Sequence, residues 1–171
     1  VIPPIVEPTP SAEKVPNQYI YASAAPKGLE ATLDAWLEVY PKLHPQSKLW
    51  VCHGGWGAPA NRPRGPNVHY LGALTPAETR QKIAESEYLF YVNKYPETFC
   101  AIAAVAEQPG KEPLLLCAGA PSGLTEAVNH KINRDRAEFI TAVWTNTKPA
   151  VTPPINYSEN KIVTAWENLL I

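Results

Sequence analysis

The sequence predicts an α/β fold, with a doubly wound, mostly parallel sheet and helices on both faces. Strand-like and helix-like patterns alternate along the 171 residues as β-α-β-β-α-β-α-β-α, which is typical of this architecture. The run "EPLLLCAG" (112–119) is almost wholly apolar, as expected for a central parallel strand covered on both faces. Glycines and other small residues follow most of the predicted strands. Because ligands of such folds bind beyond the carboxyl ends of the strands, the loops at those ends form the candidate site.

The first half of the chain contains three predicted strands, with a long helix between the first two. The run "QYIYAS" (18–23) is rich in aromatic and β-branched residues, which favour strands. "KLWVCHGG" (48–55) and "NVHYLGAL" (67–74) supply the next two strands, separated by a loop rich in proline, glycine and arginine. The helix ends near Pro41 and has apolar residues at helical spacing: Leu29, Leu33, Trp36, Leu37 and Tyr40.

A second helix, at 75–86, carries its own start signal. Thr75 is an N-cap residue, Glu78 stands three positions later, and Pro76 occupies the first helical position. This combination predicts a capping box, in which each of the two side chains accepts a hydrogen bond from the other residue's backbone. A fourth strand follows at 87–93.

The second half of the chain continues the alternation. A helix begins near Glu97, and the apolar strand at 112–119 follows it. Helical patterns cover 123–128 and 134–144, and Ser158 is the expected N-cap of a final helix.

Composition divides the chain into three segments. Residues 1–17 are rich in proline, and "VIPPI" is better explained as a connection within a longer chain than as an amino terminus, so we interpret them as an interdomain linker. Residues 18–150 form the Rossmann-like domain. Residues 151–171 hold a proline-rich connection and the final helix, which we expect to pack on the same domain.

Charge and cysteine content exclude several classes of function. The formal net charge is -1 and no basic stripe is present, so binding of nucleic acid or of an anionic membrane through bulk charge is not expected. Cys52, Cys100 and Cys117 leave one thiol unpaired in any pairing, which favours free thiols in a reducing, cytoplasmic compartment. They lack CxxC spacing, and we predict no metal site.

The loop "ASAAPKG" (22–28) follows the first strand and opens the first helix. Its small residues, including Ser23 and Gly28, would let backbone amides approach an anion, and Lys27 would lie against a phosphate. The competing interpretation of Lys27 is a solvated side chain at a helix start. The loop has neither the GxGxxG fingerprint nor the P-loop pattern, so those two nucleotide sites are excluded.

Two further loops place glycines at strand ends. In "HGGWG" (53–57), His53 would donate to a phosphate or a sugar hydroxyl, and Gly54 would allow close approach of a ligand. The alternative for His53 is a strand-end histidine bonded to neighbouring backbone. In "GALT" (72–75), Gly72 begins a loop whose backbone groups would face a planar base.

The stretch "NKYPET" (93–98) places Glu97 in a strand-to-helix turn. Its ordinary explanation is an acid that complements the helix dipole, but the amides after it are donors without intrahelical partners, at Thr98, Phe99 and Cys100. The loop "AGAPSGL" (118–124), which includes Gly119, is again rich in small residues. Five loops of this kind at one sheet edge predict a ligand that bears phosphate.

Four segments, in this order and spacing, resemble the carboxyl-terminal, nucleotide-sugar-binding half of retaining GT-B glycosyltransferases of the family 4 type. The resemblance covers roughly residues 18–130, and it rests on "YIYASAAPKGLEATLDAW", "NVHYLGALTPAE", "YPETFC" and "LCAGAPSGLTEAV". It implies the Rossmann-like half of a GT-B fold.

The resemblance also implies roles for particular residues. Lys27 and Gly28 match the Lys-Gly that contacts the donor diphosphate, and Glu97 matches the first glutamate of the family's E-x7-E motif, near the donor sugar. The chain departs from the family at two positions. Ala22 stands where a basic residue is usual, and Val105 stands where the second glutamate would hold the ribose.

Three functions follow from these observations as hypotheses. The first is the donor-binding half of a hexosyl-type glycosyltransferase, which transfers a sugar from a nucleotide diphosphate to a glycan or lipid-linked acceptor with retention. It needs no cofactor or metal, and it would be inactive without an amino-terminal GT-B half, through which peripheral contact with a membrane is left open. The second is a non-catalytic binding or scaffold domain with a degenerate donor site. The third is an unrelated doubly wound domain, such as a flavodoxin-like protein or a sugar-phosphate enzyme.

Overall fold

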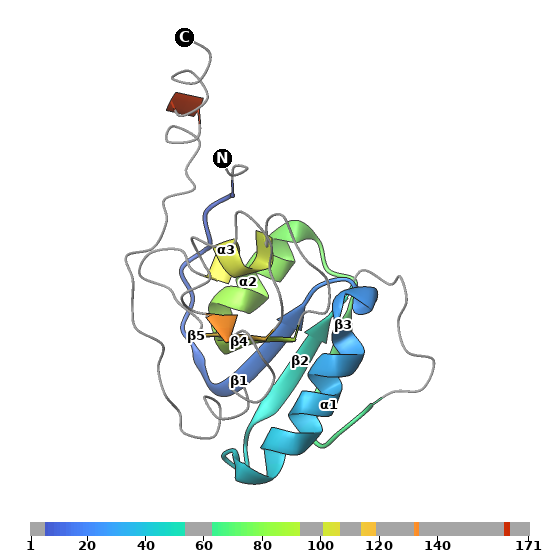
Figure 1. Ribbon diagram of the computed structural model, residues 1–171. Helices are drawn as coiled ribbons and strands as arrows, with labels where there is room; N and C mark the ends of the chain where they lie inside the picture. Colours follow the sequence, from blue (N-terminus) through green and yellow to red (C-terminus); the bar gives the residue numbers. More distant parts are fainter. Residues whose placement is uncertain are drawn as a thin grey trace.

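Six parallel strands form a single sheet in the order β3-β2-β1-β4-β5-β6 (Figure 1). The computed structural model describes residues 6–53, 63–92, 101–106, 114–118, 132–133 and 163–164. The strands are β1 (Val15–Ala22), β2 (Lys48–Cys52), β3 (Val68–Gly72), β4 (Ser86–Val92), β5 (Leu114–Ala118) and β6 (Ile132–Asn133). This order is that of the Rossmann fold, in which the chain reverses direction across the sheet between β1 and β4. The predicted fold class is confirmed.

Helices cover both faces of the sheet (Figure 1). The two longer helices are α1 (Leu29–Val39) and α2 (Pro76–Glu85). The shorter helical elements are α3 (Ala101–Ala106) and the 3₁₀ helices η1 (Ala25–Lys27) and η2 (Tyr40–Lys42). Trp36 of α1 packs against Tyr19 of β1 on one face, with ring centroids 5.2 Å apart. On the other face, Lys82 of α2 lies over the ring of Trp50 in β2. None of the helices in the described ranges is long and apolar enough to cross a membrane.

The predicted strands agree with the observed ones to within a few residues, and β1 shows the largest difference. It begins at Val15, inside the segment that the sequence indicates as linker. Asn17 has a positive φ of 58°, and the register to β4 shifts between Val15 and Tyr19. The Asn17 amide donates to the carboxylate of Glu87 at 2.6 Å. A β-bulge therefore lets the strand run through a Pro-Asn pair that looks like a strand breaker.

Several predicted features fall outside the described residues. These are the helical patterns at 123–128 and 134–144 and the N-cap at Ser158. Val163 and Thr164 are helical, in agreement with the predicted final helix. The short strand β6 was not predicted, because two residues are too few to show a period.

The core on the α1 face is built around Trp36, which is fully buried. Its ring meets those of Tyr19 and Phe90 edge to face, and its indole N–H donates to the carbonyl of Pro66 at 2.9 Å. Leu37, predicted on the same apolar stripe, is instead 45% exposed. Each helical residue is rotated about 100° from the one before it, so Ala35 and Leu37 lie on opposite sides of Trp36, and the buried stripe includes Ala35 but not Leu37.

The start of α2 confirms the predicted capping box. The hydroxyl of Thr75 accepts from the Glu78 amide at 3.2 Å, and the Glu78 carboxylate accepts from the Thr75 amide at 2.8 Å. The Thr75 amide and hydroxyl both donate to the Glu78 carboxylate, and these two hydrogen bonds lower the pKa of Glu78. Pro76 stands at the first helical position, where no amide donor is needed. The position of α2 relative to the carboxyl end of β3 is therefore set by local sequence.

Candidate functional site

The carboxyl ends of neighbouring strands lie side by side, as a parallel sheet requires. Ala22 at the end of β1 pairs with Cys52 of β2, and Cys52 pairs with Gly72 of β3. On the other side, Val92 of β4 pairs with Ala118 of β5. The five strand ends that precede the loops selected from the sequence therefore lie at one edge of the sheet, which is where doubly wound folds bind ligands.

A cavity of about 130 Å³ lies at this edge, between the ends of β1 and β2 and the β3–α2 connection. Its lining residues are Ala22, Ser23, Cys52, His53, Leu74 and Thr79. Ser23 and His53 were predicted as ligand contacts, and the structure brings them together. Leu74 lies in the predicted "GALT" loop. Thr79 was missed, although its place in the first turns of a capped helix after a strand was a usable signal.

His53 is held at the end of β2 by the backbone of β3. It is 4% exposed, and its amide donates to the carbonyl of Gly72 at 3.2 Å. Its ring meets that of Tyr70 at a steep angle, with centroids 6.1 Å apart. That amide contact joins two backbones and does not involve the imidazole, and the residue also lines the cavity. Gly72 has a positive φ of 76°, a conformation that favours glycine at the turn leaving β3.

The turn that follows β1 leads into α1 through η1. The Lys27 amide donates to the carbonyl of Ala24 at 2.9 Å, and the Tyr21 hydroxyl donates to the same carbonyl at 2.8 Å. Gly28 has a φ of 121°, which only glycine adopts readily, and its carbonyl accepts the first helical hydrogen bond, from Thr32. Lys27 and Gly28 thus join the strand to the helix, but they are not among the residues that line the cavity.

The remaining predicted contacts lie outside the described residues. They are Glu97, Gly54, Thr98, Phe99, Cys100 and Gly119. The roles of these six residues therefore remain predictions. The last described residue before Glu97 is Val92, whose amide donates to the buried hydroxyl of Thr32 at 3.1 Å.

Among the described residues, the cavity lining holds no acidic side chain and no lysine or arginine. Burial raises the pKa of the Cys52 thiol to about 12, against a smaller opposing effect of the Lys82 charge, so the thiol is neutral at physiological pH. Within the described ranges, no three His, Cys, Asp or Glu side chains are grouped to hold a metal ion. The lining suits a neutral ligand recognised through hydroxyls, an imidazole and apolar contact.

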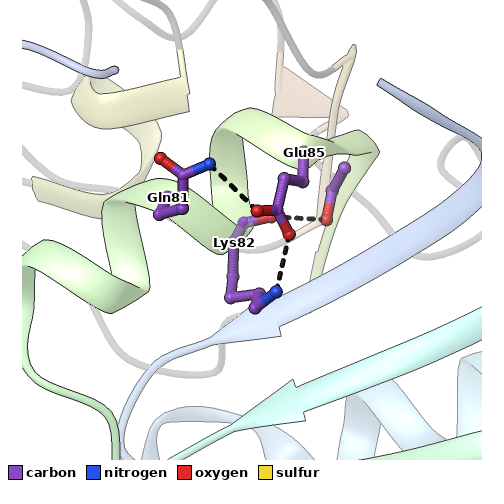
Figure 2. A network of polar contacts seen from close by, with 4 residues as sticks. Gln81, Lys82 and Glu85 are labelled. Carbon is purple, nitrogen blue, oxygen red and sulfur yellow. Dashed lines mark hydrogen bonds and ion pairs between the residues drawn. The ribbon is translucent and has the colours of Figure 1, made fainter. Parts of the chain in front are cut away.

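Lys82, whose charge acts on the pKa of the cavity residue Cys52, interacts with Glu85 and Trp50. Its ammonium lies 2.7 Å from the Glu85 carboxylate, which also accepts from Gln81 at 2.9 Å (Figure 2). Burial disfavours the charged form of Glu85, but these hydrogen bonds outweigh it and lower its pKa. The same ammonium lies 5.0 Å from the ring centroid of Trp50. Binding a phosphate would require Lys82 to leave both partners.

Because the Cys52 thiol is neutral and buried, we expect it to react slowly with thiol reagents. In a Cys100→Ser/Cys117→Ser background, Ellman's reagent at pH 8 should modify the folded chain at least about tenfold more slowly than the unfolded chain, because burial lowers the thiolate fraction and limits access of the reagent. A raised pKa also means that the free energy of unfolding should decrease as pH rises from about 8.5 toward 12. Rapid labelling of the folded chain would contradict this and identify an activated thiol.

Val105, at the position of the family's second glutamate, belongs to the core. Its side chain is 8% exposed and lies in the cluster of buried apolar residues. Its carbonyl accepts from the hydroxyl of Thr9 at 2.8 Å. Ala22, where the family has a basic residue, is 3% exposed and contributes to the cavity wall. Both residues that differ from the family pattern, Val105 and Ala22, are therefore buried side chains of the folded domain.

Known proteins resemble this chain in structure but not detectably in sequence. No protein-family model matches the sequence, and no curated protein matches it significantly. Among solved structures, a chain described under "Crystal structure of GtfA/B complex" matches with a TM-score of 0.68 and 16% sequence identity. The match covers 99% of this chain and 39% of that chain, so this chain spans about two fifths of the other's length. The likeness shows the fold, a Rossmann-like α/β domain of the kind that forms half of a GT-B glycosyltransferase.

Proposed function

We propose that this chain is the nucleotide-sugar-binding half of a glycosyltransferase, one that transfers a hexosyl group from a nucleotide diphosphate to a glycan or lipid-linked acceptor with retention. The observation that carries the proposal is the cavity at the carboxyl edge, which contains the predicted contacts Ser23 and His53. The fold shared with the GtfA/B structure supports the same class.

The lining residues suit the neutral end of such a donor. Leu74 and Ala22 would pack against a planar base, and the hydroxyls of Ser23 and Thr79 would bond to its polar edge or to the ribose. The diphosphate would lie toward Lys27, which ends η1 four residues after Ser23 and is separated from the first residue of α1 by Gly28 alone. There the lysine charge and the helix dipole would both favour an anion.

In this mechanism the protein contributes positioning and electrostatics. Lys27 and the amides near α1 would stabilise the negative charge that develops on the departing diphosphate, and Glu97 would hold the hydroxyls of the transferred sugar. The donor brings the leaving group itself, so the proposal requires no cofactor or metal. The acceptor would be held by the other GT-B half, and we expect the isolated chain to bind donor without turnover.

A second candidate is a non-catalytic domain with a degenerate donor site that acts through protein contacts. Two observations favour it: Val105 is buried in the core, and Ala22 places a methyl group where charge is usual. The similar solved structure is that of a complex, which makes a protein partner a reasonable proposal for this chain too.

Nucleotide titration distinguishes the two functions. UDP, GDP and their sugars should each be tested by thermal shift, and a nucleotide at a hundred times its Kd should stabilise the chain by about 2.7 kcal/mol. For a chain of this size that corresponds to a rise in Tm of roughly 5–10 °C. Ser23→Ala and Lys27→Ala should each raise the Kd for the nucleotide about three- to tenfold.

Lys42→Ala is the matched control, since Lys42 ends η2 beyond the carboxyl-terminal end of α1, at the opposite edge of the sheet. It should bind as wild type does. If no nucleotide raises the Tm, or if Lys27→Ala and Glu97→Ala bind as tightly as wild type, the donor-site proposal is wrong and the scaffold function is favoured.

A further inference from the structure

The size of the cavity at the carboxyl edge bears on which nucleobase could bind there. Its volume is about 130 Å³. An engineered cavity of about 150 Å³ in another protein holds benzene, which is a single six-membered ring. The space at this edge therefore matches one planar ring of that size better than the two fused rings of a purine.

One side of the cavity is formed by the ends of paired strands. Ala22 of β1 and Cys52 of β2 are partners in the parallel register, and both are buried. His53 follows directly, and its amide donates to the carbonyl of Gly72 at 3.2 Å. Because backbone hydrogen bonds between strands hold these residues, a wider cavity on this side would require the packed sheet to deform.

The other side is formed at the start of α2. Leu74 precedes the N-cap Thr75 by one residue, and Thr79 follows it by four. Side chains at these two positions face each other across a helix start. The Thr79 amide donates to the carbonyl of Thr75 at 2.9 Å, and the capping box between Thr75 and Glu78 holds the same turn. Leu74, the largest apolar side chain among the described lining residues, is thus placed by a helix start with well-defined geometry.

We propose that the cavity is a subsite for a single-ring base, so that the donor carries a pyrimidine nucleotide and not a purine one. This assignment rests on the proposed function and adds to it the class of nucleotide. A six-membered ring would lie between the strand ends and Leu74, and the hydroxyls of Ser23 and Thr79 would bond to its polar edge. A purine adds a second ring, which would either displace Leu74 or stay partly in water, and extra volume forced against a packed wall weakens binding.

The test compares the Kd values of UDP, CDP, ADP and GDP for the 171-residue chain by calorimetric titration. All four nucleotides carry the same ribose and diphosphate, so a difference between their Kd values reports the base. The tighter of the two pyrimidine nucleotides should bind at least about tenfold more tightly than either purine nucleotide.

Two variants enlarge the cavity on the side formed by α2. Leu74→Ala should tighten ADP and GDP relative to the pyrimidine nucleotides and reduce the preference to about threefold or less. Leu74→Val removes less volume and should give an intermediate preference, and it provides the same comparison if Leu74→Ala does not fold. Leu37→Ala is the matched control, because it makes the same change at a 45% exposed position on α1 and should leave the preference unchanged.

Two results would overturn the single-ring assignment while the proposed function stands. Equal or tighter binding of ADP or GDP by the wild-type chain would mean that this cavity does not select the base by size. An unchanged preference in folded Leu74→Ala and Leu74→Val would mean that Leu74 does not limit the base subsite. If none of the four nucleotides binds to the wild-type chain, the proposed function is wrong and the single-ring assignment fails with it.

Discussion

Trp36→Ala is expected to lower the free energy of unfolding by about 4 kcal/mol, the typical cost of removing a large aromatic side chain from a packed core. The indole is fully buried and contacts the rings of Tyr19 and Phe90. Its N–H also bonds to the carbonyl of Pro66, which ties the segment before β3 to α1. The variant therefore leaves a cavity and an unpaired carbonyl. Urea denaturation followed by circular dichroism measures the loss.

Two variants separate these contributions. Trp36→Phe keeps an aromatic ring but removes the donor to Pro66, so its loss should be intermediate. Leu37→Ala changes the neighbouring residue, which is 45% exposed, and should cost less than about 1 kcal/mol. Equal losses in Trp36→Ala and Leu37→Ala would contradict the assignment of α1's buried face.

Val105→Glu, which restores the family's second glutamate, is expected to destabilise the chain by about 3 kcal/mol or more without tightening nucleotide binding. The residue is 8% exposed and belongs to the apolar core cluster, so a carboxylate there would be desolvated. Thermal unfolding and titration with UDP and GDP measure the two effects.

Val105→Gln is the control for size and polarity without charge. Burial raises the pKa of a carboxyl group, so the glutamate variant is most stable, relative to the glutamine variant, below the unfolded-state pKa near 4.3. Its disadvantage should therefore grow as pH rises from about 4 to 7. A Val105→Glu chain with wild-type stability and tighter nucleotide binding would instead mean that a ribose-holding geometry is intact there.

These variants bear on how a donor could bind here. A buried Val105 and a wall formed by Ala22 remove two charged contacts that the resemblance implies. What remains at this edge is a cavity without acidic side chains, lysine or arginine among its described residues, with Ser23 and His53 in its wall, and Lys27 in the adjoining turn. Recognition would then depend on shape and neutral hydrogen bonds at one end and on a single lysine at the other.

The fold could be predicted because its signals are local. The strand patterns, the Thr75–Glu78 capping box and the glycine at Gly28 each act over a few residues, and each appears in the structure as expected. The site could be predicted in part, because parallel strands must bring their carboxyl ends to one edge. That rule placed Ser23 and His53 together.

Other features depend on which distant segments meet. Thr79 joins the cavity wall because the ends of β1 and β2 lie beside the start of α2, and Leu37 faces outward although its sequence spacing fits the apolar stripe. The contact of Thr9 with Val105 spans 96 positions, and no periodic pattern relates the two residues.

By itself, then, the sequence determined the order of strands and helices, the helix start at Thr75 and the edge of the sheet where a ligand would bind. The tertiary structure decided that Thr9 bonds to the carbonyl of Val105, that position 105 is core, and that the described cavity wall holds no acidic side chain, lysine or arginine. The physical reason is the range of the interactions. Backbone propensity and capping act within one or two turns, whereas burial and charge at a site depend on side chains that only the folded chain brings together.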